Sequence, residues 1–371
     1  MRHDRKRRSF SMSLCCFAAA LMLAAPEARA DPVLADPSRY KISLYADLTP
    51  FGFHTKSLQL TITPGENGFA AGMYVTSPFT PSPNPDRLFF VTGPGAVSTV
   101  NSALDTPENL VFARGAYGDG MLISEPSNNR LQRLLADGTL TTFASLGTAP
   151  FGPTGLAYDA GGNLYATDFL SGNILRVAPD GSSSILATIP IPSIPDAFSG
   201  AKPILADLGG RYGSGLIVGT FSVTDDAPTL ADILYLVSLD GSLIQPLAGG
   251  FSGLEFIALG DGGAFGLDLY ASTIGGDANR DGGVFTVAPD GTVSPFLTSI
   301  DATHVVFDSL GVLGGGLFVS DFNESVGSAR IWRITPVPEP GTYALLILGF
   351  GIAGCALRFR GRAKVLSPQR A

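Results

Sequence analysis

The amino-acid sequence predicts an all-β protein, a β-propeller of about six four-stranded blades, with five or seven blades as alternatives. The first observation is a strand–turn–strand unit at residues 164–181, LYATDFLSGNILRVAPDG, in which two β-prone runs are joined by the turn residues 171–173. The same plan recurs at four other places, namely residues 121–138, 216–241, 269–291 and 317–336. The third observation is composition: 46 glycines, 27 prolines and only 15% charged residues favour short strands and tight turns over helices.

An Asp-Gly pair closes four of these units, and successive pairs are 43, 60 and 50 residues apart. The aspartates of these pairs are Asp137, Asp180, Asp240 and Asp290. Periods of about 40–50 residues with four strands each are typical of propeller blades. Such a sheet cannot bury both faces alone, so we expect the units to stack around an axis. Residues 31–336 hold about six units of roughly 50 residues.

The beginning of this propeller domain is its least regular part. Residues 40–48 and 56–63 alternate like strands, whereas the proline-rich residues 78–85 cannot lie inside a sheet. Residues 87–100 predict a strand, a turn and a second strand. We expect these segments to form a first, irregular blade.

Residues 1–30 are predicted to be a signal peptide. A basic start precedes an apolar run at residues 14–25, and the small residues Ala28 and Ala30 predict cleavage after Ala30. The alternative, a transmembrane anchor, would require a longer apolar run. The segment RRSF at residues 7–10 also resembles a twin-arginine export signal, so the general secretory route and the twin-arginine route both stay open.

Residues 337–371 form a three-part tail. Pro338, Glu339 and Pro340 precede an apolar run at residues 343–357. A basic cluster follows, made of Arg358, Arg360, Arg362 and Lys364. This tail resembles the PEP-CTERM sorting signal of Gram-negative bacteria, which is also catalogued as the C-terminal domain of some ice-binding proteins.

The resemblance implies that an exosortase recognises the Pro-Glu-Pro motif and removes the tail. The 15 apolar residues would give ~22 Å of helix, against a hydrocarbon layer of ~30 Å, so a permanent single transmembrane helix would be marginal. We therefore expect export, tethering to the inner membrane during sorting, and then a place at the cell surface or outside the cell. The alternative is an ordinary membrane anchor. Ice binding is not expected, because the repeats are propeller-like and form no flat Thr-rich face.

Charge and cysteine content exclude several kinds of site. Residues 31–336 contain 13 Lys and Arg against 29 Asp and Glu, a net charge of −16, which argues against nucleic acid as a partner. The cysteines all lie in the terminal segments, at Cys15, Cys16 and Cys355. Only His54 and His304 remain in the domain, so a zinc site of His and Cys ligands is not expected. Both histidines are expected to be structural or surface residues.

Residues 153–177, PTGLAYDAGGNLYATDFLSGNILRV, resemble the repeats of NHL and regucalcin-like (gluconolactonase-type) propellers. The resemblance implies the fold, and an enzyme of that type would need a divalent metal in the axial channel. Four acidic residues near predicted strand ends are candidates to line such a channel: Glu125, Asp168, Glu255 and Asp321. The alternative is that they cap strand ends in solvent. None matches the metal ligands of that family closely enough to be assigned, and no catalytic residue is predicted.

A calcium loop is the sharpest local motif. Asp277, Asn279 and Asp281 occupy alternate positions before Gly282, as in the first half of a calcium-binding loop. The twelfth position would be Ala288, so the usual bidentate carboxylate is missing. The alternative is an Asp/Asn/Gly-rich turn that binds nothing. Calcium is therefore the one cofactor that the sequence suggests.

Together these features predict an exported β-propeller of the cell surface or extracellular matrix with a non-enzymatic binding or structural role. Its loops and an acidic channel face would meet an extracellular polysaccharide, another surface protein or an ion. The alternative is a calcium-dependent hydrolase or lactonase of the gluconolactonase type, which would have at least three carboxylate or amide ligands near the axis. A structural surface protein without a ligand is a third possibility. Phosphate-binding loops and nucleophile elbows are absent from the sequence.

Overall fold

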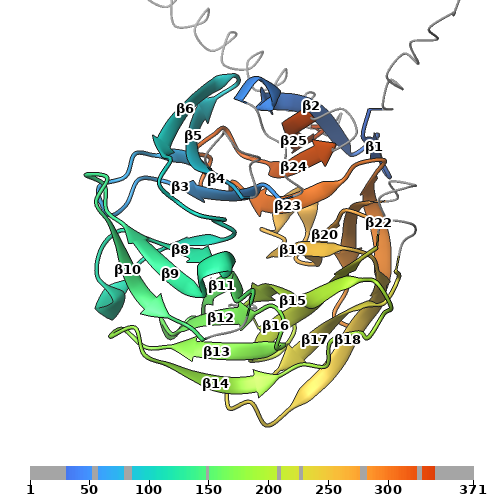
Figure 1. The fold of residues 1–371 in the computed structure, drawn as a ribbon. Helices are drawn as coiled ribbons and strands as arrows, with labels where there is room; N and C mark the ends of the chain where they lie inside the picture. The colour runs from blue at the N-terminus through green and yellow to red at the C-terminus, as the bar shows by residue number, and fades with distance from the viewer. Residues whose placement is uncertain are drawn as a thin grey trace, which may run out of the picture. The chain divides into compact units, whose positions relative to one another are not determined.

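Six antiparallel sheets stand around a common axis (Figure 1), which confirms the predicted all-β, six-bladed propeller. The computed structural model describes residues 31–51, 57–78, 86–147, 150–206, 210–224, 229–275, 282–323 and 328–338. Each sheet has four strands, and the fifth gains a short additional strand, β1 (Val33–Leu34). The innermost strands of neighbouring blades contact one another, so they enclose the axis.

The strands of each blade follow one another from the axis outwards. The first blade consists of β3 (Gln59–Thr63), β4 (Gly72–Ser77), β5 (Arg87–Gly93) and β6 (Ala96–Asn101); the second of β7 (Leu110–Phe112), β8 (Met121–Glu125), β9 (Arg130–Leu134) and β10 (Leu140–Ser145); and the third of β11 (Pro153–Tyr158), β12 (Leu164–Asp168), β13 (Asn173–Val177) and β14 (Ser183–Thr188). The fourth consists of β15 (Phe198–Leu205), β16 (Leu216–Val223), β17 (Asp232–Val237) and β18 (Ile244–Phe251); the fifth of β19 (Leu254–Leu259), β20 (Leu269–Thr273), β21 (Gly283–Val287) and β22 (Val293–Thr298); and the sixth of β23 (Ala302–Phe307), β24 (Leu317–Asn323), β25 (Ser328–Pro336) and β2 (Tyr40–Asp47). Short 3₁₀ turns are η1 (Thr49–Phe51), η2 (Gly115–Tyr117), η3 (Pro126–Asn128) and η4 (Gly263–Phe265).

The Asp-Gly pairs form the tight turns between the third and fourth strands of their blades. In the third blade the N–H of Ser182 donates to Oδ1 of Asp180 at 3.0 Å, and Gly181 has a φ of +83°. A side chain would be strained at that φ, which explains why glycine follows the aspartate. The other three pairs make the same bond at 2.9–3.0 Å.

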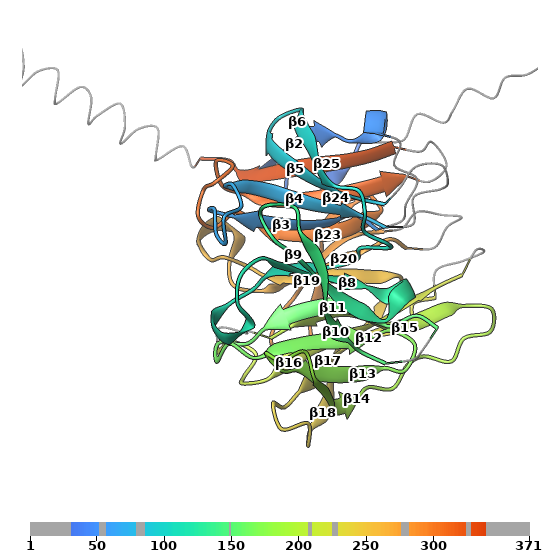
Figure 2. The same cartoon turned by 60° about the vertical axis from the view of Figure 1, so that its left-hand side comes forward.

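The N-terminal strand closes the ring. β2 pairs with β25 in antiparallel register, from Tyr40 opposite Pro336 to Asp47 opposite Arg330. Figures 1 and 2 show this blue strand beside the red strands of the last blade. The prediction that it belongs to the first blade was wrong, because alternating hydrophobicity identifies a strand but not its partner.

The hydrophobic core lies between neighbouring blades rather than inside any one of them. One cluster joins Leu122 and Leu131 of the second blade to Leu156 and Leu164 of the third, and all four are almost fully buried. Trp332 of β25 is also buried and donates from Nε1 to Oδ2 of Asp321 at 3.2 Å, so it packs the last blade. Stacked blades thus bury the faces that a lone sheet would expose.

Two tyrosines tie blades together through hydrogen bonds to the main chain. The hydroxyl of Tyr117 donates to the carbonyl of Val177 at 2.7 Å and accepts from the N–H of Leu164 at 3.0 Å. Tyr212 makes the equivalent pair of contacts between the fourth and fifth blades. Each hydroxyl satisfies two buried backbone groups that belong to the next blade.

We expect Tyr117→Phe to lower the free energy of unfolding by about 1–3 kcal/mol, because it leaves a buried N–H and a buried carbonyl without a partner. Urea unfolding followed by tryptophan fluorescence would measure the loss. Tyr235→Phe is the control, because the Tyr235 hydroxyl bonds to none of the described residues and its loss should have little effect. Equal stability of the two variants would contradict this role for Tyr117.

No helix among the described residues is long and apolar enough to cross a membrane. The predicted signal peptide and the apolar run at residues 343–357 lie outside the described residues.

Candidate functional site

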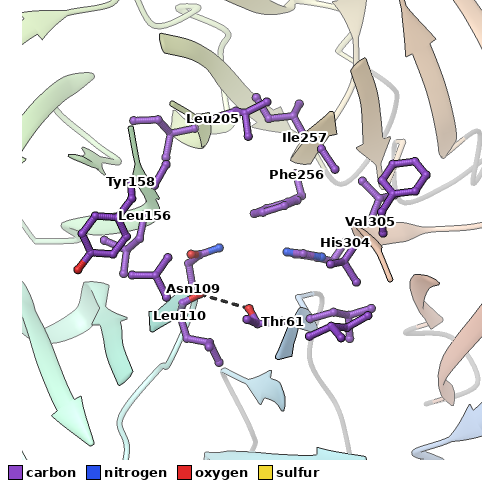
Figure 3. Close-up of a pocket in the computed structure, with 18 of the residues that line it drawn as sticks. Thr61, Asn109, Leu110, Leu156, Tyr158, Leu205, Phe256, Ile257, His304 and Val305 are labelled. Carbon is purple, nitrogen blue, oxygen red and sulfur yellow. Dashed lines mark hydrogen bonds between the residues drawn. The ribbon is translucent and has the colours of Figure 1, made fainter. Parts of the chain in front are cut away.

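An open pocket of about 420 Å³ lies on the propeller axis, and all six inner strands line it (Figure 3). Every blade contributes aliphatic residues to the lining, and those that remain partly exposed include Ile62, Val111, Leu205, Ala258 and Val306. This volume is within the range of small-molecule sites. The expected acidic channel face is therefore wrong for this part of the channel, because the strand pattern turns apolar residues toward the axis.

Three side chains from different blades approach one another at the centre of this pocket: Asn109, Phe256 and His304 (Figure 3). The rings of Phe256 and His304 are stacked, with centroids 3.5 Å apart. His304 is only 2% exposed, and its Nδ1 has no hydrogen-bond partner among the described residues. Burial, together with the nearby Lys202 ammonium, lowers the pKa of His304 well below its usual value, so the imidazole is neutral.

A buried ion triad lies beside this pocket on the axis. The Lys202 ammonium is 2.7 Å from Oε2 of Glu255 and 3.5 Å from Oε2 of Glu108. The Ser57 hydroxyl donates toward the same two carboxylates, at 3.2 Å for Glu108 and 3.3 Å for Glu255. Four blades thus supply one compact polar cluster that a single ammonium holds together.

Burial and charge act in opposite directions on this triad. Burial by itself would lower the pKa of Lys202, but the two carboxylates outweigh it and raise that pKa, so the ammonium keeps its proton. Burial raises the pKa of Glu255 to about 7, although Lys202 pulls it down. Lys202 therefore acts as a fixed counter-charge, and Glu255 can exchange a proton near neutral pH.

Hydroxyl groups fix the main chain around the axis. The second strand of every blade carries at least one buried Ser or Thr, and the set includes Thr76, Ser124, Thr167, Thr220, Ser272 and Ser320, which are fully buried. Four of them donate to a main-chain carbonyl in or just before the inner strand of the next blade, at 2.7–2.8 Å. The acceptors include the carbonyls of Glu108 and Lys202. The backbone that carries the triad is therefore fixed by neighbouring blades.

Only one of the four acidic candidates reaches the axis. Glu255 belongs to the triad, whereas Oε2 of Glu125 lies 2.6 Å from Nε of Arg130 within the second blade. Asp321 accepts from Trp332, and Asp168 is 7% exposed with a pKa that burial raises. The alternative, that these acidic residues cap strand ends in solvent, was therefore also wrong, because the carboxyls are buried.

Sequence reasoning missed Glu108, Asn109 and Lys202, and it assigned His304 to structure or surface. One signal was available for Lys202, because it is the only charge in the strand FSGAKPIL. Asn109 and Glu108 precede a three-residue strand and carry no such signal. His54 lies outside the described residues.

The axial carboxylates do not fit a divalent cation. Lys202 already occupies the space between Glu108 and Glu255, at distances where a cation would otherwise bind. Within the described ranges, no group of three or more His, Cys, Asp or Glu side chains is placed to hold a metal. The predicted calcium ligands Asp277, Asn279 and Asp281 lie outside the described residues, so that loop stays a prediction.

Comparison with known proteins identifies the C-terminal tail. Residues 336–363 match the model of the PEP-CTERM protein-sorting motif. The chain carries a PEP-CTERM sorting signal. This PEP-CTERM signal directly follows β25, whose last residue is Pro336, and Pro338 is exposed. The motif therefore begins where the propeller ends, and it implies export and sorting that depend on an exosortase.

Two solved structures with TM-scores above 0.5 support the fold of the propeller of this PEP-CTERM protein. An auxiliary nutrient binding protein from Bacteroides ovatus is 10% identical, with 81% of this chain and 78% of that chain covered and a TM-score of 0.53. A putative gluconolactonase is 15% identical over 82% and 98% of the chains, with a TM-score of 0.51. A virginiamycin B lyase from Staphylococcus aureus is 13% identical over 80% and 100%, with a TM-score of 0.48. No curated protein matches the sequence.

The raised pKa of Glu255 predicts a pH-dependent stability difference. The carboxyl ionises near pH 4.5 when unfolded and near 7 when folded, so between these values the folded protein holds a proton that the unfolded chain has released. Its contribution to the free energy of unfolding therefore falls as the pH rises, by up to about 1.4 kcal/mol per pH unit. His304 acts in the opposite direction. Because folding lowers its pKa, its contribution to the free energy of unfolding rises as the pH rises.

Comparison with Glu255→Gln isolates the contribution of Glu255. We expect the variant to become more stable relative to the parent as the pH rises from 5 to 7, because glutamine has no proton to lose. Urea unfolding of both proteins at several pH values would show this. A stability difference that stays constant over that range would contradict the raised pKa.

Proposed function

We propose that this PEP-CTERM protein is delivered to the cell surface or extracellular matrix, where its propeller binds a ligand in the axial pocket without catalysing a reaction. The observation that supports the proposal best is the contrast between the axial pocket and the ion triad beside it. The pocket is open and mainly apolar, whereas the carboxylates next to it are engaged by Lys202. A carboxylate held by an ammonium in a buried cluster is poorly placed to ligate a metal or activate water.

The alternative is a calcium-dependent hydrolase or lactonase, and a direct assay separates the two. We expect the purified protein to show no hydrolysis of glucono-δ-lactone that depends on added calcium. Titration calorimetry with calcium chloride, on the parent and on Asp277→Ala/Asp281→Ala, would locate any bound ion. Calcium-dependent hydrolysis that survives this double substitution would overturn the non-enzymatic proposal and favour the hydrolase. Binding lost in the double variant, without hydrolysis, would make calcium structural.

The proposed sorting of the protein to the cell surface can be tested separately. We expect mass spectrometry of the mature protein to show the loss of the tail from about the Pro-Glu-Pro motif onwards, and Glu339→Ala to retain the tail. A mature parent protein that keeps its tail would favour an ordinary membrane anchor. Extracellular polysaccharide or a surface protein is the proposed neighbour at the final location.

A further inference from the structure

We infer that the axial pocket takes an uncharged, largely apolar small molecule that carries one hydrogen-bonding group, and that this group meets Asn109 and His304. The inference rests on the proposed binding function and names the class of ligand. It combines three observations, namely the apolar wall, the two polar side chains without partners at the centre, and the balance of charge around the pocket.

The wall determines that most of the ligand is apolar. Aliphatic residues of every blade line the pocket, and those that remain partly exposed include Ile62, Val111, Leu205, Ala258 and Val306. The Phe256 ring adds an aromatic surface at the centre. A ligand that fills this volume would remove these side chains from water, which is the main favourable contribution to binding in such sites. A sugar, with a hydroxyl on most of its carbons, would leave many polar groups without partners against this wall.

Two side chains at the centre can receive the polar group. The Thr61 hydroxyl is already used, since it donates to the carbonyl of Leu110 at 3.3 Å (Figure 3). Asn109 bonds to Ser124 through its main chain, while its side-chain amide bonds to none of the described residues. His304 also lines the pocket, although its Nδ1 is itself buried and has no partner in the described part of the chain. A ligand group that reaches the Asn109 amide or the edge of the imidazole gains a hydrogen bond there.

The charges around the pocket favour an uncharged ligand. Neutral His304 offers one donor and one acceptor nitrogen but no charge. Lys202 is held by two glutamates, and the lining contains one residue of each sign, Glu66 and Arg114, whose charges balance. An ionised group at the centre would lose its hydration beside Asn109, Phe256 and neutral His304, which carry no charge.

A pair of fluorescent probes that differ by one charge tests this inference. N-phenyl-1-naphthylamine is uncharged and has one N–H donor, and 8-anilinonaphthalene-1-sulfonate has the same framework with an added sulfonate. Both brighten in apolar surroundings. We expect the uncharged probe to bind the full-length protein with one-to-one stoichiometry, and the sulfonate to bind at least about tenfold more weakly.

Variants place the probe in the pocket. Ala258→Trp fills the wall from β19 and should abolish binding, with Ala258→Leu as a milder filling variant if the first does not fold. Ala96→Trp makes the same change on the exposed outer strand β6 and should leave binding unchanged. Asn109→Leu and His304→Leu should each weaken binding by about two- to tenfold, the worth of one hydrogen bond.

The outcomes separate this inference from the proposed function. Equal or tighter binding of the sulfonate, abolished by Ala258→Trp, would overturn the ligand class and leave the binding role intact. No binding of either probe, or binding that both pocket-filling variants leave unchanged, would overturn the site. Calcium-dependent lactone hydrolysis would instead overturn the proposed function, and the probes play no part in that assay.

Discussion

Lys202→Met is expected to be the most damaging single substitution on the propeller axis, at about 3–5 kcal/mol of unfolding free energy. Methionine keeps most of the side-chain volume but removes the ammonium that lies 2.7 Å from Glu255 and 3.5 Å from Glu108. Two carboxylates would then share a buried site without a counter-charge. Urea or thermal unfolding at pH 7 would measure the loss.

Two controls make this prediction specific. Arg211→Met removes an ion pair of similar length, 2.6 Å to Asp268, but both side chains are more than a third exposed, so little change is expected. Adding Glu255→Gln to Lys202→Met should recover part of the lost stability, because only one buried carboxylate is then left unpaired. The loss should also shrink at pH 5, where Glu255 is protonated more easily. A loss no larger than that of Arg211→Met would show that the triad is not a buried ion cluster.

Deletion of residues 31–48 should destabilise the propeller more than any single substitution away from the axis. The deletion removes β1 and β2, exposes the edge of β25 and takes Tyr40, Tyr45 and Leu48 out of the core. At roughly 1.5–3 kcal/mol for each large buried side chain, these three residues alone contribute about 5 kcal/mol or more. We expect a much lower unfolding midpoint, or no cooperative transition, in differential scanning calorimetry.

Leu44→Ser provides the matched control for the deletion. It changes the same closing strand at a residue that is 48% exposed, so stability should change little. A deletion variant that unfolds cooperatively at the parental temperature would show that ring closure by β2 is dispensable. An exposed β25 edge should also promote association between chains, which light scattering would detect.

Local chemistry was enough to predict the blades. The unit at residues 164–181 folds as β12, a turn and β13, and the Asp-Gly pairs form the turns that their φ angles require. The C-terminal sorting motif could likewise be recognised from the sequence, because it depends on a short linear pattern.

The candidate site could not be predicted in the same way. Glu255 was one of four similar acidic candidates, and nothing in its local sequence distinguishes it from Glu125, which pairs with Arg130 five residues later. Lys202 stood out as a lone charge in a strand, but its partners lie in other blades, 94 and 53 residues away in the chain. The residue pattern of one strand does not predict which side chains of other blades it will contact at the axis.

The strands, the tight turns, the blade repeat and the sorting signal could be read from the chain, because each depends on residues that are close together in it. The pairing of β2 with the last blade, the ion pairs of Lys202 with Glu108 and Glu255, and the approach of Asn109 to His304 in an apolar pocket depend on the folded ring. Closure of the ring is the cause. It brings the Ser320 hydroxyl within 2.7 Å of the carbonyl of Leu58, 262 residues away, and it makes the axis a meeting point of six distant segments.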